Sequence, residues 1–405
     1  MARIGIDFGT SYTTVAHVRP DGIAEAIRID GSEKIPTILY YPPDGEEPMV
    51  GGAAFGMYEI CCELEDQEEI DRHMAGMFSG LKREMVPQAN LYLPNGRALS
   101  YSQMIGEFFR YIKQEVEETC FRNEEVTEVC ITYPVAFQEE TYKIEILKEA
   151  ARFAGFDNVR VLMEPVAASM GFEQSYDYKG KSILIYDFGG GTFDLAFVKF
   201  DTTGDHITLP PMGEKNCGGE NIDRILYDEW RKIADCNVGG MLNAPFLKHV
   251  CMKNKEFLSN YFRKMPQWTL KEKIAGRMRS MSITRDQWNA LISPVIDKTI
   301  SLTDKMLTRI KSEGFTIDDV ILIGGSSKIP LVTQRLSEIL PVAPRPVQDL
   351  DIAVAKGAAI FVNQDMIQEK RCYCRRDGRP MTTRAKFCRF CGTANFKYDY
   401  RFETM

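Results

Sequence analysis

The sequence predicts an α/β protein made of two similar halves, and three observations support this fold class. The chain has 405 residues and 44% hydrophobic content, which is more than one ordinary compact domain requires. An Asp-Phe-Gly turn between two β-prone stretches occurs twice, at Asp7 and at Asp187, 180 residues apart. Strand patterns alternate with helical patterns in both halves. A duplicated α/β arrangement is the simplest explanation.

The first half begins with a predicted hairpin. Ile4, Ile6 and Phe8 alternate on one face, the pattern breaks at Gly9, and β-prone residues follow. Helical spacing of apolar residues then predicts helices, and short apolar runs predict strands. These elements are, in order, a helix over 106–121, a strand from 128 to Pro134, a helix over 139–156, a strand over 159–163 and a helix over 164–174.

The second half repeats this plan from residue 182 onwards. The stretch 182–200 reads as strand, glycine turn and strand, because three glycines in a row pack nothing and mark a turn or a ligand contact. The later elements follow from apolar periodicity. They are predicted helices over Ile222–Ala234, Lys271–Met281 and Asp286–Ser312, a strand from 319, and helices over 329–340 and 351–364. The acidic run "ELEDQEEID" is interpreted as a solvated helix face.

Charge and cysteine usage set the C-terminal segment apart. The chain carries a net charge of −7, but residues 370–405 hold ten Lys or Arg against three acids, a net +7 that leaves −14 for the remainder. The N-terminal sequence lacks the features of a signal peptide, and no apolar run is long enough for a membrane helix. A cytoplasmic protein with reduced thiols and no membrane partner is therefore expected.

The two glycine hairpins offer what a nucleoside triphosphate needs. Phosphate oxygens require backbone N–H groups without side chains in the way, and carboxylates can hold Mg²⁺ or its waters. Both Asp-Phe-Gly turns supply these groups. The sequence contains neither a P-loop nor a strand-linked G-x-G-x-x-G motif, so these two nucleotide folds are disfavoured.

From about Ile4 to Val362 the chain resembles the nucleotide-binding domain of the 70-kilodalton heat-shock chaperone family, within the actin-like ATPase superfamily. The motifs that carry this resemblance occur in the family's order. They are "IGIDFGTSYTTVA", "YPVAF", "LMEPVAASMGF", "LIYDFGGGTFDLAFV", "CGGENID", "VILIGGSSKIPLV" and "DIAVAKGAAI".

The resemblance implies an actin-like ATPase fold, with two duplicated lobes and a central nucleotide cleft, and the cysteines of the tail add a small C-terminal zinc ribbon to this expectation. Lobe I is expected over 1–176, with 347–368 returning to it and a subdomain at about 36–104. Lobe II is expected over 177–346, with a subdomain at about 218–291. The tail module is expected over 370–405.

The resemblance also assigns the phosphate side of the site. Asp7 and Asp187 would orient Mg²⁺ through its water shell, and Lys82 stands where the family has its catalytic lysine, with a surface lysine as the alternative. The residues expected around the metal and the attacking water are Glu164, Asp187, Thr192 and Asp194. Those expected around the phosphates are Gly9, Thr10, Ser11, Tyr12, Gly189, Gly190, Gly191, Thr192, Gly218, Gly219 and Glu220.

The nucleoside side of the site is assigned in the same way. Lys328 stands where the family usually has arginine, and lysine has no planar group to stack on adenine, which weakens or replaces that contact. Arg277 and Ser280 are expected on one helix face of the second lobe. The other residues expected near adenosine are Gly324, Gly325, Ser326 and Asp351.

The chain departs from the family after residue 370. The hydrophobic linker and β-rich peptide-binding domain are not recognisable there, and Tyr142 aligns with the arginine that the family uses to couple its domains. The tail instead contains a zinc-ribbon-like knuckle, "FCRFCG". The expected Zn²⁺ ligands are Cys372, Cys374, Cys388 and Cys391. Two alternatives remain open, Asp377 as the second ligand and four unbound thiols.

These features predict an ATPase with chaperone-like activity that uses ATP, ADP and Mg²⁺. Its lobes would close with the nucleotide, and the zinc ribbon would recruit or remodel a protein partner. Binding of nucleic acid by the basic, aromatic tail is a less favoured alternative. Two other functions of the superfamily also remain, a filament-forming actin-like protein and a small-molecule kinase.

Overall fold

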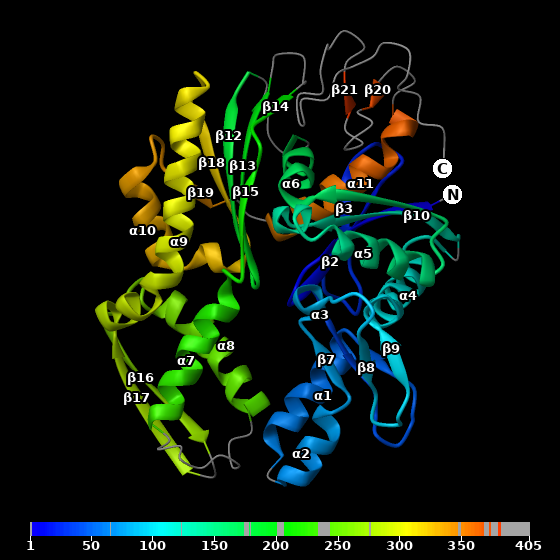
Figure 1. The fold of residues 1–405 in the computed structure, drawn as a ribbon, viewed down its shortest axis with the longest axis vertical. Coiled ribbons are helices and arrows are strands. Elements are labelled where there is room, and N and C mark those ends of the chain that lie inside the picture. The colour runs from blue at the N-terminus through cyan, green and yellow to red at the C-terminus, as the bar shows by residue number, and fades with distance from the viewer. Residues whose placement is uncertain are drawn as a thin grey trace.

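The computed structural model describes residues 2–64, 66–122, 124–173, 178, 180–200, 206–233, 244–274, 277–346, 350–367, 372–373 and 380–381. Figure 1 shows the described chain as two halves, each built around its own mixed β-sheet. The α/β fold class predicted from the sequence is confirmed. The lobe and subdomain boundaries given above stay a prediction.

The first sheet has the strand order β11-β10-β1-β2-β3, with β4 paired to β2. β1 pairs in parallel with β10 and antiparallel with β2, so the predicted hairpin around Gly9 is confirmed, with Asp7 opposite Thr14. The six strands are β1 (Ala2–Phe8), β2 (Tyr12–Val18), β3 (Ala24–Ile27), β4 (Ile35–Pro36), β10 (Val126–Tyr133) and β11 (Asn158–Met163).

Helices cover both faces of the first sheet. Side chains alternate along β10, so Val129 and Ile131 pack into the cluster with α4 and α5, whereas Cys130 packs into the cluster with α6 and α11. Ser100 and Gln103 form a capping box that starts α4, which explains why that helix begins at Tyr101. The four helices are α4 (Tyr101–Thr119), α5 (Thr141–Phe153), α6 (Glu164–Glu173) and α11 (Leu350–Ile367).

The second sheet has the order β14-β13-β12-β18-β19, with β15 paired to β13. β12 and β13 form the second predicted hairpin, in which Asp187 lies opposite Asp194. The strands are β12 (Ser182–Phe188), β13 (Thr192–Phe200), β14 (His206–Thr208), β15 (Met212–Lys215), β18 (Asp319–Ile323) and β19 (Arg345–Pro346).

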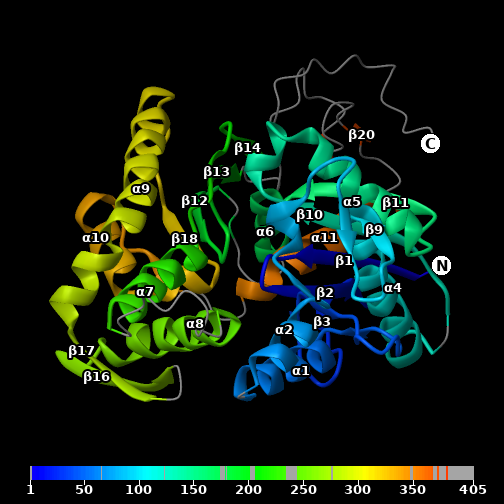
Figure 2. The same cartoon turned by 60° about the horizontal axis from the view of Figure 1, so that its bottom comes forward.

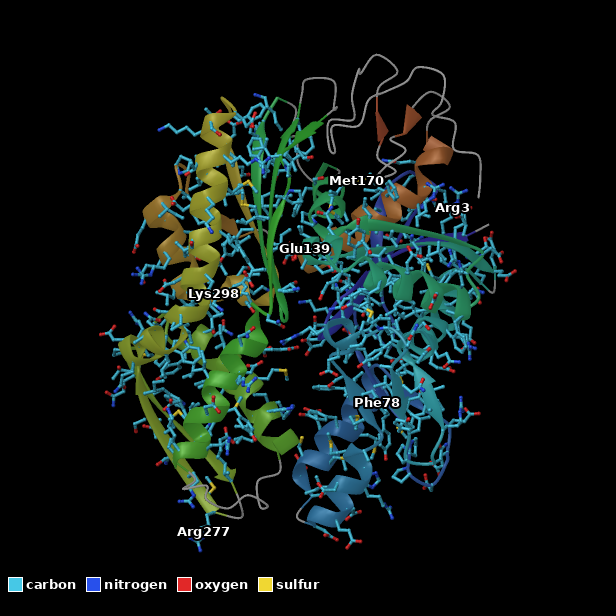
Figure 3. All side chains as sticks on the ribbon, in the orientation of Figure 1. Arg3, Phe78, Glu139, Met170, Arg277 and Lys298 are labelled. Atoms are coloured by element: carbon cyan, nitrogen blue, oxygen red, sulfur yellow. The ribbon has the colours of Figure 1, made fainter. Side chains whose placement is uncertain are left out.

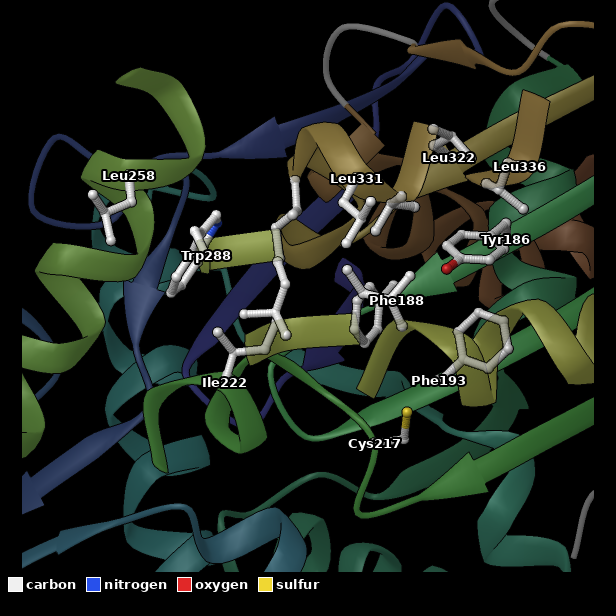
Figure 4. Packing of buried hydrophobic residues seen from close by; sticks show 14 of the residues in the cluster. Tyr186, Phe188, Phe193, Cys217, Ile222, Leu258, Trp288, Leu322, Leu331 and Leu336 are labelled. Atoms are coloured by element: carbon white, nitrogen blue, oxygen red, sulfur yellow. The ribbon is translucent and has the colours of Figure 1, made fainter. Parts of the chain in front are cut away.

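The two faces of the second sheet pack against different helices. Leu184 and Tyr186 of β12 face a core that includes α9 (Arg285–Ser312) and α10 (Pro330–Ile339), part of which Figure 4 shows. Ile183 and Ile185 face α6 and α11. Because α6 and α11 also contact the first sheet, this helix pair forms a shared layer between the two sheets.

Two glycines allow α6 and α11 to cross closely. A methyl group at Gly357 would lie 1.7 Å from the carbonyl oxygen of Ala167, and one at Gly171 would lie 2.0 Å from that of Ala353. No side chain fits at such a backbone contact, so the crossing depends on both glycines.

Gly357→Ala is expected to lower the free energy of unfolding by about 3 kcal/mol, because the helices must separate to admit the methyl group. Gly56→Ala is the matched control. Gly56 lies on the helix α1 (Gly52–Glu63), and a methyl group there would have no contact within 4 Å. That change is expected to raise the free energy of unfolding by up to about 1 kcal/mol. Urea unfolding measures both changes, and equal effects would contradict this packing.

Each half carries an additional group of elements beyond its sheet. Figures 1 and 2 show α1 of one group facing α8 of the other. Between β4 and α4 lie β5 (Ile38–Tyr40), β6 (Met49–Val50), α1, α2 (Gln67–Met74), β7 (Met77–Ser79), α3 (Leu81–Glu84), β8 (Asn90–Tyr92) and β9 (Ala98–Ser100). Between β15 and α9 lie α7 (Gly219–Ile233), α8 (Ala244–Tyr261), β16 (Gln267–Ile274) and β17 (Arg277–Thr284).

Contacts between side chains join α1 to α8. The amine of Lys253 lies 3.1 Å from the carboxylate of Glu59. The rings of Tyr58 and His249 meet edge to face at 5.5 Å, and Phe55 lies 6.0 Å from His249. The two halves therefore touch at this end as well as through α6 and α11.

The predicted helix over Lys271–Met281 is wrong, because this segment belongs to the antiparallel hairpin of β16 and β17. Ile274, Met278 and Met281 are spaced like one face of a helix, but 67% of Met278 is exposed. The buried residues on these strands include Leu270 and Ile283, which with Ile274 and Met281 follow the period of a strand. The other predicted helices and strands are present, with shifted ends.

The predicted zinc ligands lie almost entirely outside the described residues. Two short strands are described in the tail, β20 (Cys372–Tyr373) and β21 (Pro380–Met381), and they pair antiparallel. Only the backbone of Cys372 is described, and Cys374, Asp377, Cys388 and Cys391 lie outside the described ranges.

Candidate functional site

The turns of the two Asp-Phe-Gly hairpins face each other across the space between the sheets. A methyl group at Gly190 would lie 3.0 Å from the hydroxyl of Ser11, and one at Gly191 would lie 2.9 Å from that of Thr10. The first turn is equally tight, because a methyl group at Gly9 would lie 2.1 Å from the carbonyl oxygen of Tyr12. The hydroxyls of Ser11 and Thr10 therefore lie next to the glycine backbone of the second turn, where a larger residue than glycine would have little room.

Four carboxylates and one lysine gather behind these turns. Lys82, at the start of α3, forms an ion pair with Glu164, the first residue of α6, and both are buried. The hydroxyl of Thr132 donates to Asp7 at 2.9 Å, and the backbone N–H of Val135 donates to Asp194 at 2.9 Å. The fourth carboxylate, Asp187, lies opposite Asp194 in the hairpin of β12 and β13. The sequence predicted all five residues, and the fold brings them together.

Burial changes the pKa values within this carboxylate cluster. Burial, and then the charges of Glu164 and Asp194, hold the pKa of Asp187 well above its usual range. Burial and Glu164 also raise the pKa of Asp194 to about 7. Burial lowers the pKa of the Lys82 amine, but the neighbouring carboxylates outweigh it and raise that pKa overall. One ammonium does not balance four carboxylates, so the cluster has an excess of negative charge that favours a cation.

Asp194→Asn is expected to flatten the pH dependence of stability in the nucleotide-free protein. Asp194 has a pKa of about 7 in the folded chain and an ordinary value of 3.8, so the folded state binds more protons than the unfolded state between these values. The free energy of unfolding therefore falls as pH rises through this window. Asparagine cannot ionise, so the free energy of unfolding of the variant should fall less over this pH window. We expect the difference to be on the order of 1–4 kcal/mol.

Urea unfolding at about pH 5 and about pH 8 measures this difference. Glu139→Gln is the control, because Glu139 is an exposed carboxylate that Figure 3 labels near the space between the halves. A variant at Asp194 whose stability falls as steeply with pH as that of the unchanged protein would contradict the prediction.

A glycine loop at the start of α7 lies against the second hairpin turn. The N–H of Gly219 donates to the carbonyl of Gly189 at 3.0 Å, and the N–H of Glu220 donates to that of Gly190 at 2.9 Å. The loop has no room for a side chain at Gly218, since a methyl group there would lie 2.2 Å from the carbonyl oxygen of Gly190. This loop and the turn thus form one backbone surface.

The stretch after β18 completes this surface. The hydroxyl of Ser326 donates to the carbonyl of Gly189 at 2.7 Å. Gly324 has a φ of +80°, and a methyl group there would lie 2.4 Å from the carbonyl oxygen of Phe188. Gly325 differs from its neighbour, because a methyl group there would have no contact within 4 Å. Its exposed backbone faces open space.

Arg83 joins the two halves beside the carboxylate cluster, although the sequence did not single it out. It follows Lys82 on α3, forms an ion pair with Glu220 of α7 and donates to the side-chain oxygen of Asn216 at 2.9 Å. A cavity of about 350 Å³ opens next to these residues, with Lys82, Arg83, Thr10 and Thr192 in its wall. In the sequence, only its position next to Lys82 indicated that Arg83 could belong to the site.

Lys255 is a second candidate that sequence reasoning missed. A methyl group at Gly219 would lie 2.9 Å from the amine of Lys255, and this amine lies 2.9 Å from the carboxylate of Asp223. Burial raises the pKa of Asp223 to about 6, although Lys255 opposes the shift. The hydroxyl of Ser259, one turn along α8, donates to the carbonyl of Lys255 at 2.7 Å. No helix was predicted over this part of the chain, so these residues were not considered.

Three further predicted residues, Tyr12, Lys328 and Asp351, are not members of the carboxylate cluster. Tyr12 is 39% exposed, and burial followed by the charges of Glu256 and Glu59 raises the pKa of its phenol. Lys328 is exposed, and its carbonyl accepts a hydrogen bond from Arg263 at 2.5 Å. Asp351 lies near the start of α11, and its side chain lies outside the described part of the chain.

Arg277 and Ser280 do not share a helix face, because both lie on β17 and both are exposed. Figure 3 labels Arg277 at the far end of this hairpin, away from the hairpin turns of the two sheets. The helical position predicted for both residues is therefore wrong.

The described residues form neither a directly ligated metal centre nor a membrane-spanning helix. No group of three or more His, Cys, Asp or Glu side chains in the described ranges is arranged to hold a metal ion directly. Among the helices that the structure describes, none is both long and apolar enough to span a bilayer.

Comparison with known proteins identifies the family of the chain. Residues 3–365 match the family model described as Hsp70 protein. The chain is also 28% identical over 380 residues to the chaperone protein DnaK of Psychrobacter cryohalolentis. That alignment covers 88% of this chain and 58% of the relative, so the chain spans less than two thirds of the length of this relative. The mixed α/β structure is consistent with the actin-like ATPase domain of that family. The chain therefore belongs to the Hsp70 protein family.

Proposed function

We propose that the chain binds ATP between its two Asp-Phe-Gly hairpins and hydrolyses it to ADP and phosphate. The observation that carries this proposal is the meeting of both hairpin turns with the buried ion pair of Lys82 and Glu164. Membership of the Hsp70 family, whose ATPase domain uses ATP or ADP and Mg²⁺, supports the same function.

The phosphates would lie between the two turns. Thr10, Ser11 and Tyr12 would contact them from the first hairpin, and the backbone from Gly189 to Gly191 with Thr192 would contact them from the second. Gly190 and Gly191 have no side chains, and their backbone lies close to the hydroxyls of Ser11 and Thr10. This supports the arrangement, because phosphate oxygens accept hydrogen bonds from backbone N–H groups. Gly218, Gly219 and Glu220 would line the same space behind the second turn.

The excess charge of the carboxylate cluster fits a hydrated Mg²⁺. Asp7 and Asp187 would hold it through water, in keeping with the preference of this ion to retain several waters. When bound, the ion would neutralise charge on the phosphates. Glu164, Thr192 and Asp194 would position the attacking water, and the ammonium of Lys82 would stabilise the charge that develops on the transferred phosphoryl group.

The nucleoside would lie over Gly324, Gly325 and Ser326, with Lys328 and Asp351 nearby. The open space at Gly325 supports this placement. We add Lys255 to this side of the site, because its amine lies 2.9 Å from the position that a methyl group at Gly219 would occupy. A contribution from Arg277 or Ser280 has less support, since both lie on the outer hairpin.

Release of phosphate from ATP by the purified full chain, with Mg²⁺ and without a phosphoryl acceptor, tests the proposal. Turnover under these conditions supports an ATPase and counts against a small-molecule kinase of the same superfamily. Absence of turnover that an added small-molecule acceptor restores would favour the kinase. Pelleting that depends on ATP would instead favour a filament-forming protein.

The nucleotide would also control how the two halves close. Arg83 with Glu220, and Lys253 with Glu59, each join one half to the other, so both contacts would change if the halves moved apart. Distances between labels on α1 and α8 in the ADP-bound and ATP-bound chain would measure closure. Equal distances in both states would contradict a nucleotide switch.

We further propose that the C-terminal segment is a zinc ribbon that recruits a protein partner or client in the cytoplasm. The pairing of β20 with β21 and the spacing of Cys388 and Cys391 support a ribbon. Metal analysis should find about one zinc per chain. Partner identification after co-purification, with and without residues 370–405, tests recruitment. Nucleic acid captured by the tail would support the less favoured alternative.

A further inference from the structure

The edge of β16 borders an open groove on the second half of the molecule. Among the described residues β16 pairs with β17 alone, so its other edge presents unpaired backbone N–H and C=O groups. Six consecutive residues, Gln267 to Glu272, line a groove of about 680 Å³, and Asn254 and Phe257 of α8 line it from the other side. These residues define the β16 groove.

The β16 groove is aromatic at one end. Phe257 is 41% exposed and Trp268 is 37% exposed, and their ring centroids lie 5.4 Å apart. Tyr261 stacks on Phe257 at 5.3 Å and lies 4.5 Å from Trp268. Partly exposed aromatic rings beside an open strand edge provide a contact surface for an apolar side chain.

The segment of the chain that contains β16 and β17 is basic, although the chain as a whole is acidic. Residues 263–285 contain seven Lys or Arg and one acid, Glu272, a net charge of +6 in a chain of net charge −7. The side-chain amide group of Asn254 lies 3.2 Å from the carboxylate of Glu272. Lys271 lines the groove and is exposed. This charge favours an acidic ligand.

Strand geometry predicts how such a ligand would be arranged. Leu270 is buried towards the core of this half, so Lys271 beside it faces the opposite side. An added strand would place its own side chains alternately on the same two faces. Apolar residues would therefore lie towards Phe257 and Trp268, and acidic residues would lie beside Lys271.

We propose that the β16 groove binds an extended acidic peptide of a partner protein by strand addition, with alternating apolar and acidic side chains. An open strand edge favours this ligand over nucleic acid, because strand addition pairs the backbone N–H and C=O groups of the edge. Single-stranded RNA would use the aromatic rings and the charge but not this edge. The β16 groove lies apart from the carboxylate cluster, so the proposal does not depend on ATP hydrolysis.

The test uses the full chain and a short fluorescent peptide that alternates glutamate with apolar residues and has a central phenylalanine. Two further peptides carry lysine in place of glutamate, or N-methyl groups on the backbone nitrogens that would face β16. Fluorescence anisotropy should detect binding of the first peptide alone. Equal binding of the N-methylated peptide would overturn strand addition.

Matched variants locate the binding site. Trp268→Ala should weaken binding about tenfold or more, whereas Tyr92→Ala, which removes a ring that is 71% exposed in the other half, should not change it. Lys271→Glu should weaken binding several-fold and allow the lysine peptide to bind, whereas Lys305→Glu on α9 should do neither. Unchanged binding in both groove variants would overturn the proposal.

Tryptophan fluorescence gives an independent measurement. Trp230 and Trp288 are buried and Trp268 is exposed, so acrylamide quenching of the full chain reports mainly on Trp268. Bound peptide should reduce this quenching. An oligouridylate that reduces it instead, and whose binding both groove variants abolish, would assign the groove to nucleic acid and overturn the proposal.

Discussion

Lys82→Ala is expected to lower the rate of ATP hydrolysis by about 10²–10³-fold while the affinity for ADP changes much less. Lys82 is buried and forms an ion pair with Glu164, and Asp7 and Asp194 also raise the pKa of its amine. An ammonium held in this way stays charged at neutral pH and costs little reorganisation during phosphoryl transfer. Alanine removes this charge where negative charge develops on the transferred group.

The measurement compares single-turnover hydrolysis with equilibrium binding of a fluorescent ADP. Lys305→Ala is the control, because Lys305 is an exposed lysine of α9 and does not line the cavity beside Lys82. Thermal unfolding of both variants tests whether loss of Lys82 unfolds the chain, since Glu164 then stays buried without its partner. A folded Lys82→Ala protein with unchanged turnover would remove this lysine from the mechanism.

The sequence singled out Asp7 and Asp187 because each hairpin is a local feature, whereas Lys82, Glu164 and Asp194 were assigned only through the family resemblance. Three glycines after Asp187 and one after Asp7 specify tight turns, whatever the rest of the chain does. Pairing of β1 with β2 and of β12 with β13 then directs each aspartate to the end of its strand. Because the hairpin occurs twice in the sequence, we expected both turns to contribute to one phosphate-binding site.

Lys255 could not be predicted in the same way. Its amine reaches Gly219 only because α8 packs beside α7, and the ion pair with Asp223 joins residues 32 positions apart. No local pattern of glycine or charge marks this contact. Arg83 presents a similar case, because the turn of α3 sends Lys82 and Arg83 to different partners, Glu164 and Glu220.

The hairpin of β16 and β17 shows how periodicity can mislead. Ile274, Met278 and Met281 have helical spacing and predicted a helix there, but strand pairing buries Ile274 and Met281 together with Leu270 and Ile283 and leaves Met278 exposed. The same error led to the assignment of Arg277 and Ser280 to the nucleoside, because that assignment relied on their spacing on the predicted helix. Whether this segment forms a helix or a strand depends on which side chains it buries against α7 and α8. A single sequence does not show these tertiary contacts.

Gly325→Val is expected to weaken nucleotide binding by about 100-fold without changing the stability of the nucleotide-free chain by more than about 0.5 kcal/mol. A methyl group at Gly325 would have no contact within 4 Å, so the empty site can accept a side chain. If the nucleoside lies against this backbone, the valine occupies its place. The loss should therefore appear in affinity and not in folding.

Gly324→Ala is the matched control one residue earlier. Its φ of +80° and the distance of 2.4 Å to the carbonyl oxygen of Phe188 leave no room for a methyl group, so this variant should lose about 1–3 kcal/mol of stability even without nucleotide. Calorimetric titration with ADP and urea unfolding separate the two effects. If Gly325→Val binds ADP normally, the nucleoside does not lie over this turn, and the adenosine role assigned to Gly324, Gly325 and Ser326 fails even if hydrolysis is observed.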